Sequence, residues 1–242
     1  MTAIVLIHGA GDSGAIWQRQ VDYLSARHRV LAVDLPGHGA RLSETGLDRH
    51  EKNAAEVCRI MDREGISKAV IVGHSMGGAV AMIMALDHAD RVEGLALVAT
   101  GARLKMRPEF VEQARQSAEA YGNKMPASTH IIPVEQMVHP DIPSTVVQWL
   151  REKTGQASAQ AAYADFQANN NFDVMNRLPE IHVPTLVAGG SDDRMAPQKF
   201  AEFLAKSIPG ARLEILTPSG HYPMVEQEES FNRCFDDYLK SI

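Results

Sequence analysis

Cysteine is scarce in this chain of 242 residues and is poorly placed for covalent or metal chemistry. The two cysteines, Cys58 and Cys234, lie far apart in stretches with the periodicity of amphipathic helices. Such spacing provides neither a disulfide framework nor clustered metal ligands, so we expect two reduced, structural thiols. The ten histidines form no metal motif such as H-E-x-x-H. We therefore predict no metal and no cofactor.

Basic residues are also in the minority, with 24 Lys and Arg against 30 Asp and Glu, which gives a formal net charge of −6. A nucleic-acid backbone or an anionic membrane surface would on average repel such a chain, so we expect neither as a partner. No apolar run approaches the about 20 residues that span a bilayer. Met1-Thr2-Ala3 leads directly into a strand pattern without a basic signal region. We expect a soluble, cytoplasmic protein.

Short apolar segments alternate with longer segments of helical periodicity along the chain. The apolar segments are mostly unbroken, as in strands buried on both faces, and they span residues 4–7, 30–33, 69–72, 95–98, 185–188 and 213–216. Between them, apolar residues recur at helical spacing. This alternation predicts an α/β fold with a doubly wound, mostly parallel sheet and right-handed crossovers. Ligands of such sheets bind beyond the carboxyl ends of the strands.

Residues 101–179 interrupt this alternation. They contain no convincing strand, only helical patterns near 108–121, 143–153 and 157–169. We interpret 101–179 as a helical lid inserted into a single core domain formed by 1–100 and 180–242. Most large apolar side chains of the lid are expected to pack inside the protein and a minority to line a substrate pocket. These side chains are Phe110, Met125, Met137, Trp149, Tyr163, Phe166 and Phe172.

Residues 73–78, Gly-His-Ser-Met-Gly-Gly, connect the apolar run 69–72 to a helix-forming stretch. A sharp strand-to-helix turn would strain the backbone of Ser75 and push its hydroxyl toward a ligand, while Gly73 and Gly77 relieve crowding. The alternative is an ordinary glycine-rich turn in which Ser75 caps the helix.

A serine hydroxyl is a weak nucleophile that needs a base held by a third group. Candidates follow in chain order. Asp192 and Asp193 come after the strand pattern 185–188, and His221 comes after 213–216. Because both loops should open at the edge of the sheet that displays Ser75, an acid and a histidine are available to assist it.

These motifs resemble the α/β-hydrolase family over nearly the whole chain, from His8-Gly9-Ala10-Gly11 through Asp-Leu-Pro-Gly-His-Gly at 34–39 to His221. The resemblance implies a catalytic triad of Ser75, Asp193 and His221. In the family the acid usually lies three residues after a glycine and shortly before a proline, as Asp193 does, which makes Asp192 the less favoured neighbour.

The resemblance also implies an oxyanion hole formed by the backbone N–H groups of Ala10 and Met76. His8 and His74 are expected to be buried and hydrogen-bonded rather than to carry protons. We expect five residues to line the substrate pocket, although for Trp17 a role in the core of a helix is the alternative. These are Gly9, Trp17, Trp149, Phe172 and Tyr222.

Two departures from the family pattern bear on the prediction. The N-terminal hairpin that usually precedes the first parallel strand is missing. The edge strand of the sheet is then either exposed or covered by a partner, so we expect a monomer or a homodimer. The nucleophile is a serine, which argues against the haloalkane dehalogenases and epoxide hydrolases that share the fold.

The sequence thus predicts a serine hydrolase of the carboxylesterase or enol-lactone hydrolase type. It would cleave a carboxylic ester, thioester or lactone of a small to medium apolar acyl compound through an acyl-enzyme intermediate. The same triad could instead cleave carbon–carbon bonds of vinylogous diketones or transfer acyl groups to alcohols. A small-molecule receptor that turns over slowly or not at all is the alternative outside catalysis.

Overall fold

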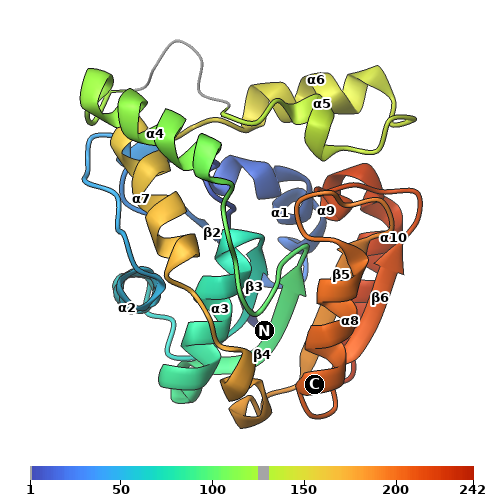
Figure 1. The fold of residues 1–242 in the computed structure, drawn as a ribbon. Coiled ribbons are helices and arrows are strands. Elements are labelled where there is room, and N and C mark those ends of the chain that lie inside the picture. Colours follow the sequence, from blue (N-terminus) through green and yellow to red (C-terminus); the bar gives the residue numbers. More distant parts are fainter. Residues whose placement is uncertain (1, 125–130) are drawn as a thin grey trace.

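A computed structural model, which describes residues 2–124 and 131–242, contains a sheet of six strands in the order β2-β1-β3-β4-β5-β6 (Figure 1). Every neighbouring pair of strands is parallel. All six predicted strands are confirmed, with only their ends extended. They are β1 (Ala3–Ile7), β2 (Arg29–Val33), β3 (Ala69–His74), β4 (Val92–Val98), β5 (Thr185–Gly190) and β6 (Arg212–Leu216).

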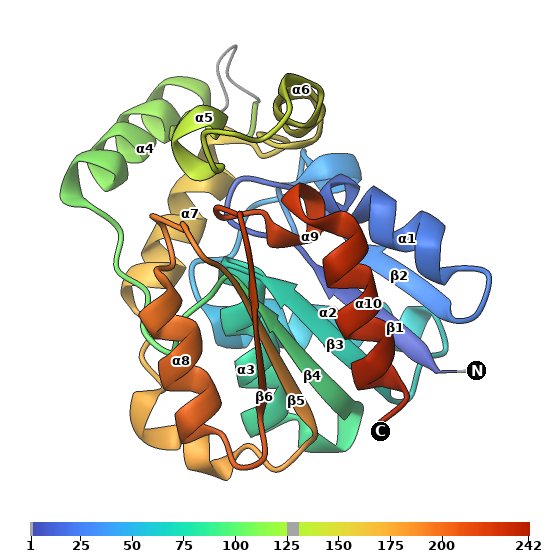
Figure 2. The same cartoon turned by 90° about the vertical axis from the view of Figure 1, so that its right-hand side faces the viewer.

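Helices cover both faces of the sheet (Figure 2). Val5 and Ile7 of β1 belong to an apolar cluster with the helices on one face, whereas Ile4 and Leu6 belong to the cluster on the other face. This split follows from the alternation of side chains along a strand. It confirms the doubly wound α/β fold. The first face carries α2 (His50–Arg63), α3 (Met76–Asp87) and α8 (Gln198–Ser207), and the second carries α1 (Gln18–Leu24) and α10 (Glu228–Leu239).

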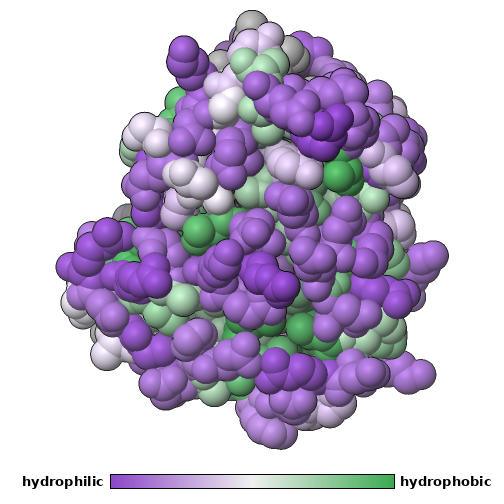
Figure 3. Space-filling model, turned by 60° about the vertical axis from the view of Figure 1, so that its left-hand side comes forward, coloured by the Kyte–Doolittle hydropathy of each residue, from purple (hydrophilic) through white to green (hydrophobic). Residues whose placement is uncertain are grey.

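Helices α4 (Pro108–Tyr121), α5 (Val134–Met137), α6 (Ser144–Lys153) and α7 (Ala159–Asn170) lie between β4 and β5 in the chain. The three predicted helices of this region are present as α4, α6 and α7. Helices α4, α5 and α6 lie above the carboxyl ends of the strands (Figure 1). Hydrophilic residues dominate the outer face on the side of α4 and α7 (Figure 3), so these helices direct their apolar sides inward.

The last part of the inserted region packs with the sheet. Phe172, Val174 and Leu178 lie in the same apolar cluster as α3 and α8, and the Val174 N–H donates to the Ala102 carbonyl at 2.8 Å. The division of the chain into a core of 1–100 and 180–242 and a lid of 101–179 stays a prediction.

Cys58 and Cys234 are buried free thiols. Within the described ranges, no helix is both long and apolar enough to cross a bilayer.

Backbone approaches backbone closely at the turn between β3 and α3. Ser75 has a φ of 51° and a ψ of −115°, a conformation that a residue with a side chain rarely adopts. A Cβ on Gly73 would lie 2.1 Å from the Gly77 carbonyl oxygen, and one on Gly77 would lie 2.3 Å from the Ile7 carbonyl oxygen. Only glycine lets α3 start this close to β3 and β1.

We predict that Gly73→Ala lowers the free energy of unfolding by about 3 kcal/mol or more, because the new methyl group meets backbone that cannot move aside. Urea denaturation followed by circular dichroism measures the change. Gly189→Ala in β5 is the control, since a Cβ there meets side chains at 3.2 Å or more. It should cost less than about 1 kcal/mol. Equal losses in the two variants would show that crowding at this turn is not what requires glycine.

Candidate active site

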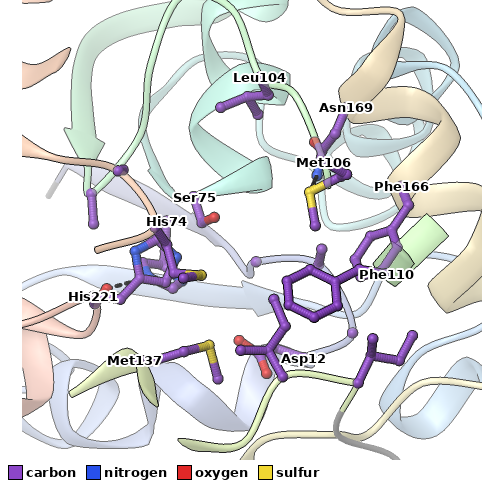
Figure 4. Close-up of a pocket in the computed structure, with 18 of the residues that line it drawn as sticks. Asp12, His74, Ser75, Leu104, Met106, Phe110, Met137, Phe166, Asn169 and His221 are labelled. Carbon is purple, nitrogen blue, oxygen red and sulfur yellow. Dashed lines mark hydrogen bonds between the residues drawn. The ribbon is translucent and has the colours of Figure 1, made fainter. Parts of the chain in front are cut away.

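A cavity of about 520 Å³ lies beyond the carboxyl ends of the strands, beneath α4 and α7 (Figure 4). Ser75 and His221 both border it, as do Gly9, Ala10 and Tyr222. Much of the remaining wall is apolar, and its large apolar side chains are Leu104, Met106, Phe110, Ile131, Ile132, Met137, Phe166, Met195 and Phe200. Four basic side chains also border the cavity, namely Arg103, Lys105, Arg107 and Arg194. The volume is in the range of about 300–1,000 Å³ typical of small-molecule sites.

The backbone around Ser75 is fixed on both sides. Its N–H donates to the Val98 carbonyl at 2.9 Å, and its carbonyl accepts from the Thr100 hydroxyl at 2.7 Å. The Ser75 side chain makes no capping hydrogen bond with α3. The hydroxyl is therefore not used by the helix, in contrast to the helix-capping alternative.

Asp193 and His221 form a buried hydrogen-bonded pair. Nδ1 of His221 donates to Oδ2 of Asp193 at 2.8 Å, and Oδ1 of Asp193 accepts from the N–H groups of Met195 and Ala196 at 2.7 and 2.9 Å. Asp192 is exposed, and its carboxylate faces the Ser191 hydroxyl instead. Of the two neighbouring carboxylates, Asp193 is the one in contact with the histidine.

Burial alone would lower the pKa of His221, but the charge and the hydrogen bond of Asp193 oppose it, and the net pKa lies above its ordinary value. His74 is different. Burial, together with the adjacent His221, holds the pKa of His74 well below its ordinary value, so His74 is neutral. Its Nε2 donates to the His221 carbonyl at 2.8 Å. His74 is thus a buried, hydrogen-bonded residue, as expected.

In the described part of the chain, no hydrogen bond joins the Ser75 hydroxyl to His221, although both border the same cavity. Catalytic hydrogen bonds are often long in ligand-free sites and shorten when a substrate binds.

The two predicted oxyanion donors lie on opposite sides of Ser75 in the sequence. Ala10 follows β1 and borders the cavity, and Met76 is the first residue of α3. Neither N–H donates to another group among residues 2–124 and 131–242. The N–H of Met76 is one of the donors that a helix leaves unsatisfied at its start, where the helix dipole favours negative charge.

A buried carboxylate anchors the loop that carries Ala10. Oδ2 of Asp165 in α7 accepts from the Gly11 N–H at 2.8 Å and from Nε2 of His38 at 3.0 Å. The other ring nitrogen of His38 faces the Pro36 carbonyl at 3.0 Å, so both nitrogens meet acceptors. Although burial opposes it, the charge of Asp165 raises the pKa of His38 above its ordinary value.

His8 also orders this region, as expected. Its Nε2 accepts from the Leu35 N–H at 3.2 Å, and burial lowers its pKa to about 3.

A second carboxylate holds the loop of His221. Glu226 accepts from the N–H groups of Gly220, Tyr222 and His139 at 2.8, 2.9 and 2.8 Å. The sequence analysis missed both Asp165 and Glu226. Asp165 lies 154 positions from Gly11, and no local spacing signals such a contact.

The sequence profile described as "Alpha/beta hydrolase family" matches residues 4–233. The chain belongs to the alpha/beta hydrolase family.

Relatives of known name cover almost the whole of this alpha/beta hydrolase. A pimeloyl-(acyl-carrier protein) methyl ester esterase of Vibrio vulnificus (strain YJ016) is 31% identical over 241 residues, which span 94% of this chain and 90% of the relative. The crystal structure of the enol-lactonase from Burkholderia xenovorans LB400 superposes with a TM-score of 0.88 at 28% identity, covering 99% of this chain and 91% of that one. A thermophilic esterase from Thermogutta terrifontis superposes with a TM-score of 0.87 at 27% identity, covering 100% and 90%.

Three residues predicted for the pocket of this alpha/beta hydrolase do not line its cavity, so those predictions are wrong. Trp17 is fully buried between Phe231 and His74, in the core role given as its alternative. Trp149 of α6 faces away, with the Arg19 guanidinium 4.8 Å from its ring centre.

Phe172 is the third of these residues. It follows α7 and packs edge-on against His50, in the cluster shared with α3. Of the other large lid side chains, Phe110, Met137 and Phe166 border the cavity, Tyr163 does not, and Met125 lies outside the described residues.

We predict that His221 titrates above pH 6.5, its ordinary value, and that Asp193→Asn lowers its pKa, because the neutral amide no longer stabilises the charged ring. NMR titration of the imidazole resonances measures both values. Asp192→Asn is the control and should leave the pKa close to that of the wild type. A fall in pKa with Asp192→Asn but not with Asp193→Asn would show that the wrong carboxylate is assigned to the histidine.

Proposed function

We propose that this protein is a serine hydrolase that cleaves a carboxylic ester or lactone through an acyl-enzyme intermediate. The observation that carries the proposal is that Ser75, on its strained turn, borders the same cavity as His221, which is paired with Asp193. The named relatives agree in chemistry, since a methyl ester and an enol lactone both contain a carboxylic ester bond.

In this mechanism the Ser75 oxygen attacks the carbonyl carbon while Nε2 of His221 takes the hydroxyl proton. Asp193 accepts from Nδ1, which leaves Nε2 unprotonated and able to act as the base. The carboxylate also stabilises the positive ring that forms. The ester carbon–oxygen bond then breaks, and His221 returns the proton to the leaving alcohol. Water attacks the acyl-enzyme with the same assistance and releases the acid.

The N–H groups of Ala10 and Met76 would hold the oxyanion of each tetrahedral intermediate. Hydrogen-bond donors that are already in place before the reaction stabilise the negative charge that develops in the transition state. The loss of one such donor typically lowers the rate by about 10²- to 10³-fold. Asp165 contributes indirectly in this scheme, as a positioning residue, because it fixes the loop of Ala10 through Gly11.

The size and chemistry of the cavity favour a small to medium, largely apolar acyl or alcohol portion. We also infer a small-molecule substrate, without a nucleic-acid or membrane partner and without a cofactor or metal. A cytoplasmic location and a monomeric or homodimeric state stay predictions.

Ser75→Ala should abolish labelling by a fluorophosphonate probe and lower ester hydrolysis by about 10⁴-fold or more, because the nucleophile is lost. Mass spectrometry of the labelled peptide and initial-rate assays check both. Ser43→Ala, at an exposed serine away from the cavity, is the control and should behave as the wild type. Labelling at any residue other than Ser75 would overturn the assignment.

A substrate panel separates the proposed activity from the alternatives. We expect turnover of p-nitrophenyl esters of short acids and of simple lactones, with little on a vinylogous diketone. Turnover of the diketone with simple esters untouched would identify a carbon–carbon hydrolase. Saturable binding without acyl release, retained in Ser75→Ala, would identify a receptor.

A further inference from the structure

The wall of the cavity contains a carboxyl group that the proposed reaction does not require. Asp12 borders the cavity and is 4% exposed. Figure 4 shows its carboxylate between the labelled side chains of Met137 and Phe110. Burial of a carboxylate is costly unless hydrogen-bond donors compensate it, so the position of this group calls for donors.

The loop that carries Asp12 is held by other side chains. Asp165 and Asp34 accept from backbone N–H groups of this loop at 2.8 and 2.7 Å. Ser13 caps the short 3-10 helix η1 (Gly14–Trp17) that follows. Among residues 2–124 and 131–242, the carboxylate of Asp12 caps no helix. The local turn therefore does not explain why a carboxylate stands at this position.

The protein satisfies the Asp12 carboxylate only in part. Burial raises the pKa of Asp12 to about 7, while the Gly155 N–H and the charge of His221 act in the opposite direction. The Tyr222 hydroxyl also interacts with this carboxylate. A carboxylate has sites for about four hydrogen bonds, so these two partners leave acceptor capacity on a group that borders the cavity.

The carboxylate lies beside the proposed reaction centre. A Cβ placed on Gly9 would be 3.4 Å from Oδ2 of Asp12, so this oxygen lies directly over Gly9. The next residue, Ala10, supplies a proposed oxyanion donor. A substrate whose carbonyl oxygen sits at Ala10 would thus place groups a few bonds from the scissile carbon within reach of Asp12.

We propose that Asp12 determines specificity by accepting a hydrogen bond from a donor, most simply a hydroxyl, that the substrate carries close to its scissile carbonyl. This inference rests on the proposed ester hydrolysis at Ser75 and narrows its substrate class to hydroxylated esters or lactones. An apolar analogue of the same shape would leave the buried carboxylate against hydrocarbon. A hydrogen bond to a charged group corresponds to a preference of roughly 10- to 100-fold.

The test compares esters that differ only by a hydroxyl in place of a methyl group. On the acyl side these are the p-nitrophenyl esters of 3-hydroxybutanoate and 3-methylbutanoate, and on the alcohol side the 2-hydroxyethyl and propyl esters of butanoate. The ratio of kcat/KM within each pair is measured for wild type, Asp12→Leu, Asp12→Asn and Asp141→Leu. Asp141 is exposed and outside the cavity, which makes the last variant the matched control.

We expect the wild type to prefer the hydroxylated ester of at least one pair by roughly 10- to 100-fold. Asp12→Leu should abolish or reverse that preference and speed the apolar ester, Asp12→Asn should keep part of it through its amide oxygen, and Asp141→Leu should keep all of it. Fluorophosphonate labelling of Ser75 in all four proteins shows that each has a folded, reactive site.

A labelled, active wild type without preference in either pair would overturn the inference about Asp12 and leave ester hydrolysis standing. So would an Asp12→Leu variant that keeps the preference. A wild type that is neither labelled nor active on any of the four esters would overturn both proposals.

Discussion

The close crossing of β3, α3 and β1 at Ser75 is the constraint on which the site depends. Because Gly73 and Gly77 carry no side chain, α3 begins within contact distance of two strands, and the backbone of Ser75 is driven to a φ of 51°. The same crossing fixes the N–H of Met76, which makes no hydrogen bond within the described residues. One steric condition thus sets both the position of the Ser75 hydroxyl and that of a hydrogen-bond donor.

Carboxylates that take no direct part in the proposed reaction fix the positions of the loops around this turn. Asp165 reaches from α7 to the loop of Ala10, and Glu226 gathers three N–H groups around the loop of His221. A carboxylate that accepts several backbone N–H groups replaces their lost hydration and fixes the course of the chain. The reactive groups therefore stand on irregular segments that are nevertheless rigidly supported.

The six strands were predictable because continuous apolar runs of that length fit strands buried on both faces. Ser75 and His221 stood out as candidates because Ser75 directly follows one such strand and His221 lies in the loop after another. Side chains in the inserted region were predictable only in part. Helical periodicity does not tell which neighbour covers a given face, and Trp149 lies under the guanidinium of Arg19. Asp12 gave no signal at all, since its surroundings arise from distant segments that the fold brings together.

The attachment of α7 to the Ala10 loop restricts the movement of this helix away from the cavity. If α7 swung outward as a rigid body, Asp165 would leave both the Gly11 N–H and the ring of His38, and the loss of each hydrogen bond to a carboxylate costs about 1.5–3 kcal/mol. The loop of Ala10 would lose its support in the same motion. Ligands therefore have to enter and leave the cavity through other parts of its wall, while α7 stays in place.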